Sequence, residues 1–211
     1  MDRLRIALVI PALNEAGTIG DVVTRAIRYG MCVVVDDGST DTTAATARAA
    51  GAVVVSHAAN RGYDAAINTG FQTASMSSCD AIITLDADGQ HNPELLQKFI
   101  DSLHGGADMV LGVRNQFPRL AEHVFALFTR RRFGIVDPLC GMKAYKIDLY
   151  KKLGHFDLHG SIGTELMLFG ARTGVKTASI PFHVGERVGR PRFGRKLAAN
   201  LKIFRALWLA I

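Results

Sequence analysis

The stretch D-A-I-I-T-L-D-A-D-G-Q, Asp80 to Gln90, decides the fold and points to the site. Its first part is a continuous apolar run, which is typical of a strand buried on both faces of a parallel sheet. Carboxylates follow where the run ends, at Asp86 and Asp88. Ligands bind at the carboxyl ends of the strands in such sheets. The stretch therefore predicts an α/β domain with an acidic site at one edge of its sheet.

The rest of the first half repeats this pattern of a strand followed by a helix. Further strands are expected at 5–11, 31–35, 52–56 and 107–113, with Pro11 stopping the first of them. Helices are expected between the strands, at about 18–29, 41–51, 60–74 and 92–104. Because strands and helices alternate with short connections, we predict a mostly parallel sheet flanked by helices on both faces. Its polar loops should then meet at one rim.

The second half of the chain is less regular and far more basic. Residues 1–113 carry 7 Lys and Arg against 13 Asp and Glu, whereas residues 114–211 carry 18 against 6. Helices are expected at about 120–132 and 161–173, and a strand near 175–181. The split suggests an acidic half that could hold a metal and a basic half that faces anions, although an ordinary basic surface would give the same counts.

The tail from residue 195 is expected to form a C-terminal amphipathic helix. Its apolar residues fall on one helical stripe: Leu197, Leu201, Phe204, Trp208 and Ile211. Basic residues flank the stripe, so the helix could lie in a membrane interface or pack on the domain's own core. No run is long enough to span a bilayer, and the N-terminus lacks a signal-peptide pattern. These features favour a cytoplasmic protein that is peripheral on the cytoplasmic face of a membrane.

Asp86 and Asp88 are the candidate metal ligands. In an extended segment, positions i and i+2 point the same way, so both carboxylates could face one site, and Gln90 continues the alternation. Oxygen ligands suit Mg²⁺, which shares its coordination sphere with substrate phosphates. A solvated turn would carry the same D-x-D pattern. Asp36 and Asp37 could likewise meet a ribose or a base, or only bond their own turn.

Five motifs in chain order resemble glycosyltransferase family 2, which has the Rossmann-like GT-A fold. They are V-I-P-A-L-N-E (9–15), V-V-D-D-G-S-T-D (34–41), N-R-G-Y-D-A-A-I-N-T-G (60–70), L-D-A-D-G-Q-H-N-P-E (85–94) and D-P-L-C-G-M-K-A-Y (137–145). Within the family, the chain is most similar to dolichyl-phosphate mannose synthases and polyprenyl-phosphate glycosyltransferases. The resemblance implies an inverting, metal-dependent transfer of a sugar from a UDP- or GDP-sugar donor to a polyprenyl or dolichyl phosphate, with no nucleic acid involved.

The resemblance also implies a domain organisation. Residues 1–194 would form the GT-A domain, with a nucleotide and metal half at 1–113 and an acceptor half at 114–194. Residues 195–211 would form the membrane-interface helix.

Individual residues take roles from the same resemblance. The nucleotide-sugar donor would be bound by Pro11, Leu13, Glu15, Asp37, Asp86 and Arg114, with Asp37 reading the base. Mg²⁺ or Mn²⁺ would be held by Asp86, Asp88 and Gln90. Arg131, or one of its two arginine neighbours, would meet the acceptor phosphate. The catalytic residues would be Asp88, Glu165 and Arg187, with Arg187 approaching the diphosphate.

The stretch G-T-E-L-M-L departs from the family pattern. Many members have an E-D pair there, and its Asp deprotonates a hydroxyl acceptor; this chain has Glu165 followed by Leu166. A phosphate acceptor is already an anion and needs no general base, so the departure fits such an acceptor. Glu165 could orient a ligand or cap a helix. The alternatives are a saccharide or other hydroxyl acceptor, a phosphatase of the haloacid dehalogenase type, and a non-catalytic nucleotide-binding module.

Overall fold

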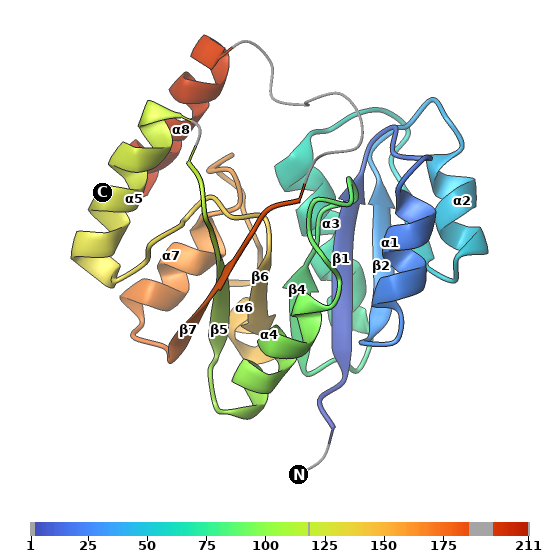
Figure 1. The fold of residues 1–211 in the computed structure, drawn as a ribbon, viewed down its shortest axis with the longest axis horizontal. Coiled ribbons are helices and arrows are strands. Elements are labelled where there is room, and N and C mark those ends of the chain that lie inside the picture. The colour runs from blue at the N-terminus through green and yellow to red at the C-terminus, as the bar shows by residue number, and fades with distance from the viewer. Residues whose placement is uncertain (1–2, 118, 186–195, 211) are drawn as a thin grey trace.

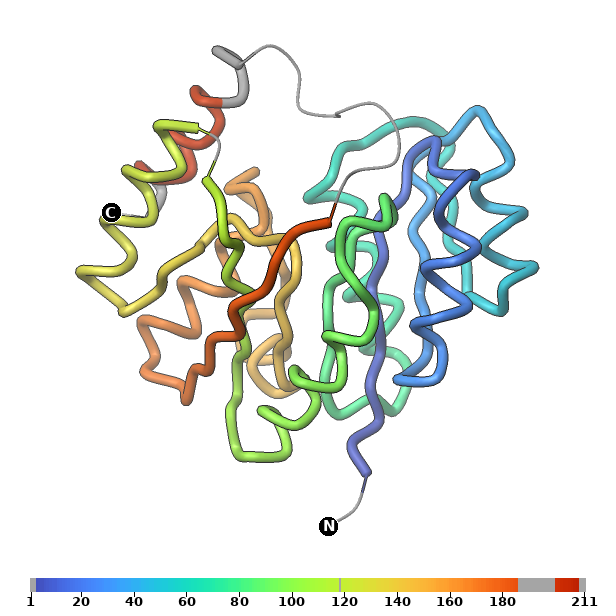
Figure 2. The backbone as a smooth tube through the Cα atoms, viewed as in Figure 1, coloured from blue at the N-terminus to red at the C-terminus, as the bar shows by residue number. Residues whose placement is uncertain are grey.

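A computed structural model describes residues 3–117, 119–185 and 196–210 of the chain. Within these residues, seven strands form one sheet in the order β3-β2-β1-β4-β6-β5-β7, which runs through the middle of the molecule in Figures 1 and 2. The strands are β1 (Ile6–Ala12), β2 (Met31–Asp36), β3 (Val53–Ser56), β4 (Ala81–Thr84), β5 (Met109–Arg114), β6 (Lys143–Lys146) and β7 (Thr177–Phe182).

The sheet is parallel except at one strand. β6 pairs antiparallel with both β4 and β5, while every other pair is parallel. The predicted parallel sheet is therefore confirmed, but β5 does not lie next to β4, because a strand from the second half of the chain separates them. The sequence analysis missed β6, since its four residues, K-A-Y-K, show neither a long apolar run nor a clear alternation.

Pro11 does not stop β1, contrary to the prediction. It pairs with Val35 of β2, and β1 continues to Ala12. The carbonyl oxygen of Val9 accepts the N–H of Leu85, which follows β4, and the carbonyl oxygen of Ala12 accepts the N–H of Asp37, which follows β2. Because backbone groups alternate in direction along a strand, the backbone nitrogen of Pro11 is directed to the β4 side. The ladder with β4 has already ended opposite Val9. Proline is tolerated there because its missing N–H removes no ladder hydrogen bond.

Helices cover both faces of the sheet, as predicted (Figure 1). One face carries α1 (Ile19–Ala26), α2 (Thr43–Ala49) and α4 (Leu95–His104). The other carries α3 (Tyr63–Met76), α5 (Leu120–Phe133), α6 (Ile147–Leu153), α7 (Glu165–Arg172) and α8 (Lys196–Ala210). Alternate residues of β1 enter the two cores: Leu8 and Ile10 on one face, Ala7 and Val9 on the other.

The predicted C-terminal helix is present as α8, and it lies beside α5 (Figures 1 and 2). Ile203 and Ala206 of α8 are buried in the same core cluster as Phe125 of α5. Phe204 and Trp208 are exposed, with 44% and 74% of their surface open to solvent. The helix therefore packs on the domain through one face and presents a second apolar face outward. No helix in the described part of the chain is both long enough and apolar enough to cross a membrane.

Candidate active site

The loops after β1 and β2 are fastened to each other at the rim formed by the carboxyl ends of the parallel strands. Asn14 adopts a left-handed conformation with φ of 51°. Its backbone N–H donates to the Ser39 hydroxyl at 2.8 Å, and its side-chain oxygen accepts from the Thr40 N–H at 2.9 Å. The N–H of Glu15 donates to the Thr43 hydroxyl at 2.8 Å. The predicted nucleoside residue Glu15 and its neighbour Asn14 are thus bonded to the residues that follow β2.

Asp37 joins the loop after β3 to this group. Its Oδ1 accepts from His57 Nδ1 at 2.7 Å and from the Arg61 N–H at 2.9 Å. Its Oδ2 accepts from the Gly62 N–H at 2.8 Å, at the start of α3. The sequence analysis missed His57, although it lies in the polar H-A-A-N-R-G loop, because only the fold shows that His57 reaches Asp37.

Gly38 explains how these loops approach so closely. Its φ is +77°, and a Cβ at this position would lie 2.6 Å from backbone atoms of Ala59 and Asn60. Any other residue would be strained and would push the loop after β3 away. The glycine of the D-D-G-S-T-D motif therefore allows the contact that brings His57 to Asp37.

Asp86 lies between the end of β4 and a turn, and Asp88 lies in that turn, so the two carboxylates do not share one extended segment as predicted. β4 ends at Thr84, and residues 87 and 88 form the turn. The argument from i, i+2 alternation therefore does not apply, and the two side chains differ in environment. Asp86 keeps 33% of its side chain exposed, whereas the Asp88 residue is only 6% exposed. Asp88 Oδ1 accepts the Gln90 N–H at 3.1 Å.

The donor set at this turn fits a divalent cation that is bound together with phosphate oxygens. Across the described ranges, no group of three His, Cys, Asp or Glu side chains could hold a metal ion. Magnesium is commonly held by one or two carboxylates plus substrate phosphates and water, so Asp86 and Asp88 match that pattern. Beside them, Nδ1 of the buried His91 lies 3.6 Å from Asp86 Oδ2 and has no hydrogen-bond partner within the described structure.

Gly141 forms a cradle for Asp86 that the sequence analysis did not identify. A Cβ at position 141 would lie 2.6 Å from Asp86 Oδ2 and 3.0 Å from Oδ1. The D-P-L-C-G-M-K-A-Y segment thus supplies a surface on which the Asp86 carboxylate rests, next to β4. The segment is held there by Thr84, whose hydroxyl donates to the Gly141 carbonyl oxygen at 2.6 Å.

Gln90 links the turn after β4 to the chain beyond β7. The Gly185 N–H donates to the Gln90 carbonyl oxygen at 3.0 Å, and Gln90 Nε2 donates to the Gly185 carbonyl oxygen at 3.2 Å. Because the amide nitrogen of Gln90 is used in this contact, its Oε1 is the end that could face a cation. The predicted catalytic residue Arg187 follows two positions after Gly185 and lies outside the described residues.

Arg114 is held in a buried ion cluster. Its guanidinium donates to both oxygens of Asp137, at 2.8 and 2.9 Å, and to Glu122 at 3.1 Å. The two carboxylate side chains are 1% and 3% exposed. Burial opposes the charge of Arg114, but the hydrogen bonds and charge of Asp137 outweigh it and raise the pKa of Arg114. The predicted contact of Arg114 with a phosphate stays a prediction.

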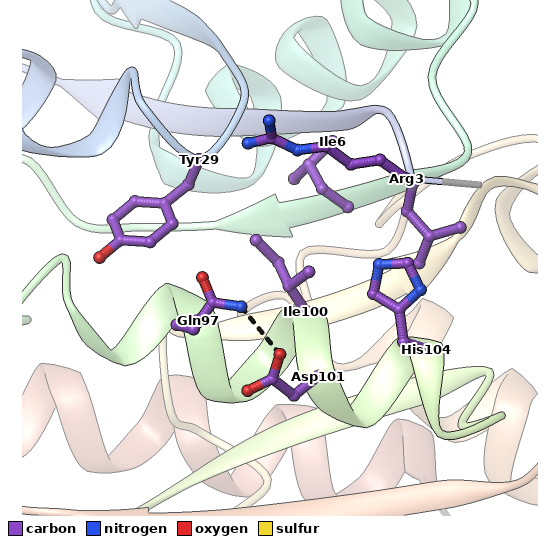
Figure 3. A pocket seen from close by; sticks show the side chains of 8 residues that line it. Arg3, Ile6, Tyr29, Gln97, Ile100, Asp101 and His104 are labelled. Carbon is purple, nitrogen blue, oxygen red and sulfur yellow. Dashed lines mark hydrogen bonds between the residues drawn. The ribbon is translucent and has the colours of Figure 1, made fainter. Parts of the chain in front are cut away.

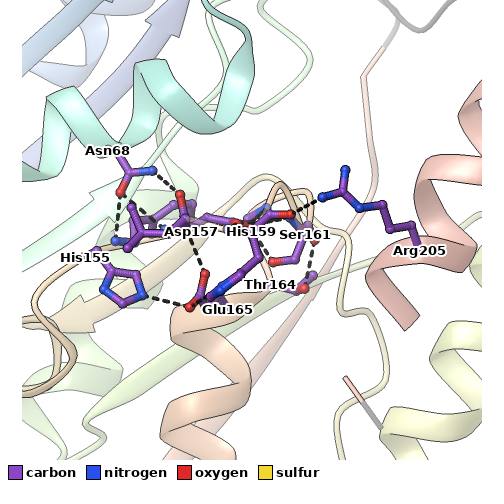
Figure 4. A network of polar contacts seen from close by, with 11 residues as sticks. Asn68, His155, Asp157, His159, Ser161, Thr164, Glu165 and Arg205 are labelled. Carbon is purple, nitrogen blue, oxygen red and sulfur yellow. Dashed lines mark hydrogen bonds and ion pairs between the residues drawn. The ribbon is translucent and has the colours of Figure 1, made fainter. Parts of the chain in front are cut away.

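Glu165 begins α7 and closes a polar network with the preceding loop (Figure 4). Its carboxylate lies 2.7 Å from His155 Nε2 and 3.0 Å from His159 Nδ1, and it accepts the Leu158 N–H at 2.8 Å. Burial by itself raises the pKa of Glu165, but these hydrogen bonds outweigh it and hold the pKa below its ordinary value. The neighbouring Leu166 is fully buried.

Asp157 delays the start of α7, which was expected near Ser161. The Asp157 carboxylate accepts the N–H groups of Ser161 and Gly163, at 3.0 and 2.8 Å. Those groups are therefore used in a loop in place of a helix. Arg205 of α8 also reaches this loop and donates to the His159 carbonyl oxygen at 3.0 Å (Figure 4). The second half of the chain thus has a defined loop between α6 and α7.

Two other features lie away from the rim. Arg131 is exposed in the last turn of α5, at the end that points away from the carboxyl ends of the strands (Figure 1). A pocket of about 230 Å³ lies at the opposite edge of the sheet, between the start of β1 at Ile6 and Ile100 of α4 (Figure 3). Ligand sites in parallel sheets lie at the carboxyl ends, so we assign the active site to the rim and not to this pocket.

Comparison with known families assigns the class of enzyme. Residues 7–154 match the family described as Glycosyl transferase family 2. The chain belongs to this family and is a glycosyltransferase, so the phosphatase and the non-catalytic alternatives are set aside.

Its relatives include an uncharacterized protein and a named transferase. An uncharacterized protein of Methanocaldococcus jannaschii is 31% identical over 194 residues, which cover 83% of this chain and 79% of that protein. The undecaprenyl-phosphate 4-deoxy-4-formamido-L-arabinose transferase of Edwardsiella ictaluri is 30% identical, and the alignment covers 93% of this chain and 65% of that protein. The chain therefore spans less than two thirds of the length of the transferase.

Solved structures confirm the GT-A fold. Glucosyl-3-phosphoglycerate synthase from Mycobacterium tuberculosis, solved with Mg²⁺ and UDP, superimposes with a TM-score of 0.78 at 24% identity. The match covers 98% of this chain and 79% of the synthase. The same enzyme has also been solved with Mn²⁺ and UDP-glucose, again with a TM-score of 0.78.

Proposed function

We propose that this glycosyltransferase transfers a sugar, with inversion, from a nucleoside-diphosphate sugar to a polyprenyl phosphate. One observation carries the choice of acceptor: the position of the family's general base is the fully buried Leu166, and Glu165 beside it is held by two histidines and a backbone N–H. A carboxylate with a lowered pKa and three donors is a poor base near neutral pH. An acceptor that is already an anion does not need one.

The reaction then requires no proton transfer. An oxygen of the acceptor phosphate forms a bond to the anomeric carbon, and the bond from that carbon to the nucleoside diphosphate breaks on the opposite face. Asp86, Asp88 and Gln90 would hold Mg²⁺ or Mn²⁺, which when bound supplies positive charge to offset the charge developing on the leaving diphosphate. Pro11, Leu13, Glu15 and Asp37 would bind the nucleoside. Arg114 and Arg187 remain the proposed phosphate contacts, whereas the position of Arg131 in the last turn of α5, away from the rim, disfavours it as one.

An outward apolar face supports a lipid acceptor. Leu201, Phe204 and Trp208 are exposed on α8, and Leu120, Val124 and Leu127 are exposed on the adjacent α5. A helix that is apolar on two faces and packs through only one of them has surface left to bury. The sequence of α8 contains no acidic residue, and the last turn of α5 carries three arginines. This combination suits an anionic membrane surface, with residues 195–211 as the interfacial segment.

A hydroxyl acceptor is the second candidate, and Asp64 favours it. Burial, with the charge of Asp157, raises the pKa of Asp64 to about 6. Its Oδ1 is buried without a hydrogen-bond partner among the described residues. A carboxylate with such a pKa could act as a general base near neutral pH.

A donor panel tests the proposal. The release of nucleoside diphosphate would be measured from UDP- and GDP-sugars, with Mg²⁺ or Mn²⁺, in the presence and absence of a polyprenyl phosphate. We expect release that depends on both the metal and the lipid phosphate. Release that is stimulated by a sugar or glycerate hydroxyl, and not by the lipid phosphate, would contradict it. Asp64→Asn would then be expected to abolish activity, whereas it should leave transfer to a lipid phosphate largely intact.

A further inference from the structure

The Asp37 carboxylate has most of its hydrogen-bonding capacity filled by the protein itself. An ionised carboxylate offers about four acceptor positions on its two oxygens. On Oδ1, His57 Nδ1 and the Arg61 N–H occupy two of them, at 2.7 and 2.9 Å. On Oδ2, the Gly62 N–H occupies one, at 2.8 Å. Within the described part of the chain, this leaves a single acceptor position, on Oδ2.

His57 is fixed in one role by its second partner. A carboxylate only accepts, so Nδ1 of His57 carries the hydrogen that Oδ1 receives. The other ring nitrogen, Nε2, lies 2.9 Å from the Thr69 hydroxyl on α3, so both nitrogens of the ring have partners. The side chains of His57 and Asp37 are only 5% and 6% exposed. The imidazole therefore cannot turn away from Oδ1 without losing two buried hydrogen bonds.

The bases of the two candidate donors differ in the number of hydrogen-bond donors that they present to such a carboxylate. Guanine presents two adjacent donors, the imino N1–H and the amino N2–H, which together match both oxygens of one carboxylate. Uracil and thymine present one imino N–H between two carbonyl oxygens. A carboxylate with one open position can satisfy the single imino donor, but it leaves one of the two guanine donors without a partner. A buried donor that stays unpaired weakens binding substantially.

We infer that His57 makes Asp37 a single-position acceptor, which selects a donor nucleotide with a uracil or thymine base over one with guanine. The inference rests on the proposed function, in which Asp37 reads the base, and it narrows the donor to one class of base. His57 acts here as a positioning and specificity-determining residue, since it acts through its contact with Asp37. The Thr69 hydroxyl holds the ring of His57 in place through its contact with Nε2.

Nucleotide binding by the whole chain tests this directly. The affinities of UDP, dTDP and GDP would be measured by titration calorimetry with Mn²⁺ present, without any acceptor. We expect UDP or dTDP to bind at least about tenfold more tightly than GDP, the order expected for one buried donor left unpaired. The comparison of UDP with dTDP distinguishes the two pyrimidine nucleotides, which differ in the ribose 2′-hydroxyl and in the methyl group of the base.

Variants of His57 separate its role from a general structural one. His57→Leu opens a second position on Oδ1 and should reduce the preference for UDP over GDP severalfold. His57→Asn, whose amide N–H can replace Nδ1–H, should restore the preference. Thr69→Val is the matched control, because it removes a hydrogen bond from the same ring but leaves Asp37 Oδ1 occupied.

The outcomes are distinct. Equal or tighter binding of GDP by the wild-type protein would overturn this inference but leave the proposed function standing. An unchanged preference in a folded His57→Leu variant would overturn the role of His57. If the folded wild-type protein bound none of the three nucleotides, the proposed function itself would fail. The wild-type comparison needs no variant to fold, so it decides the base preference alone.

Discussion

The substitution Gly141→Ala adds one methyl group directly against the Asp86 carboxylate. The new Cβ would lie 2.6 Å from Oδ2, and ordinary contact begins at 3.4 Å, so this oxygen must retreat by about 0.8 Å. The side chain can do so by rotating, because a carboxylate is the mobile end of Asp86. We therefore expect the fold to survive, with a free energy of unfolding within ~1 kcal/mol of wild type, as is usual for Gly to Ala at a permitted conformation.

Catalysis should suffer much more than stability. A displacement of about 1 Å in a positioned group can cost ~100-fold in rate, so we expect kcat to fall by roughly that factor. Turnover would be followed by nucleoside diphosphate release, and Mn²⁺ affinity by electron paramagnetic resonance. Gly105→Ala is the matched control, because its Cβ would meet no atom closer than 3.4 Å. Wild-type kcat and Mn²⁺ affinity in Gly141→Ala would refute the cradle and the metal role of Asp86 together.

Three further predictions address the other parts of the site. Asp88→Asn should abolish turnover while the thermal melting temperature changes little, and activity near wild type would exclude Asp88 as a ligand. Arg114→Met leaves the buried Asp137 carboxylate without its cation, while Glu122 keeps its ion pair with Arg119, and should cost ~3 kcal/mol in urea unfolding; a loss below ~1 kcal/mol would mean that the cluster is not a structural unit. The double variant Phe204→Glu, Trp208→Glu should bind vesicles with anionic lipid more weakly than the wild-type protein. Met76→Glu is the control, because Met76 is an apolar residue that is 87% exposed and lies outside α8, and this variant should bind like the wild type. Equal binding by the wild type, the double variant and the control would remove the membrane role of α8.

The sequence was sufficient for those parts of the fold that depend on local pattern. The five strands of the first half could be predicted because each is an apolar run bounded by turn residues, as in M-C-V-V-V before D-D-G-S. β6 could not, because K-A-Y-K becomes a strand only through its antiparallel pairing with β4 and β5. The start of α7 was missed for a similar reason, since Asp157 captures N–H groups that helical periodicity alone assigns to a helix.

In the candidate site, too, some residues could be predicted from local sequence pattern and others depend on contacts between distant segments. The carboxylates Asp37, Asp86 and Asp88 could be found from their positions after strands, because the carboxyl ends of parallel strands meet at one rim. Their partners could not be found so easily. His57 is 20 residues from Asp37, and Gly141 is 55 residues from Asp86, so both contacts depend on the packing of separate loops. A glycine or a histidine in a polar loop gives no local signal of the carboxylate it will meet.

The contacts of the basic residues in the second half of the chain show which of them could offset the charge of a donor diphosphate. Arg114 lies between two buried carboxylates, and Lys143 is fully buried with its ammonium against the Gly163 carbonyl oxygen. The last turn of α5, which carries its three exposed arginines, lies at the helix end away from the rim (Figure 1). The stretch 186–195 contains four arginines and follows directly on Gly185, which is bonded to Gln90. A donor diphosphate brings negative charge to a rim that already carries Asp86 and Asp88. We therefore propose that its counter-charge comes from a cation held by those carboxylates and from this arginine-rich stretch, with Arg187 as the first arginine that we expect to contact it.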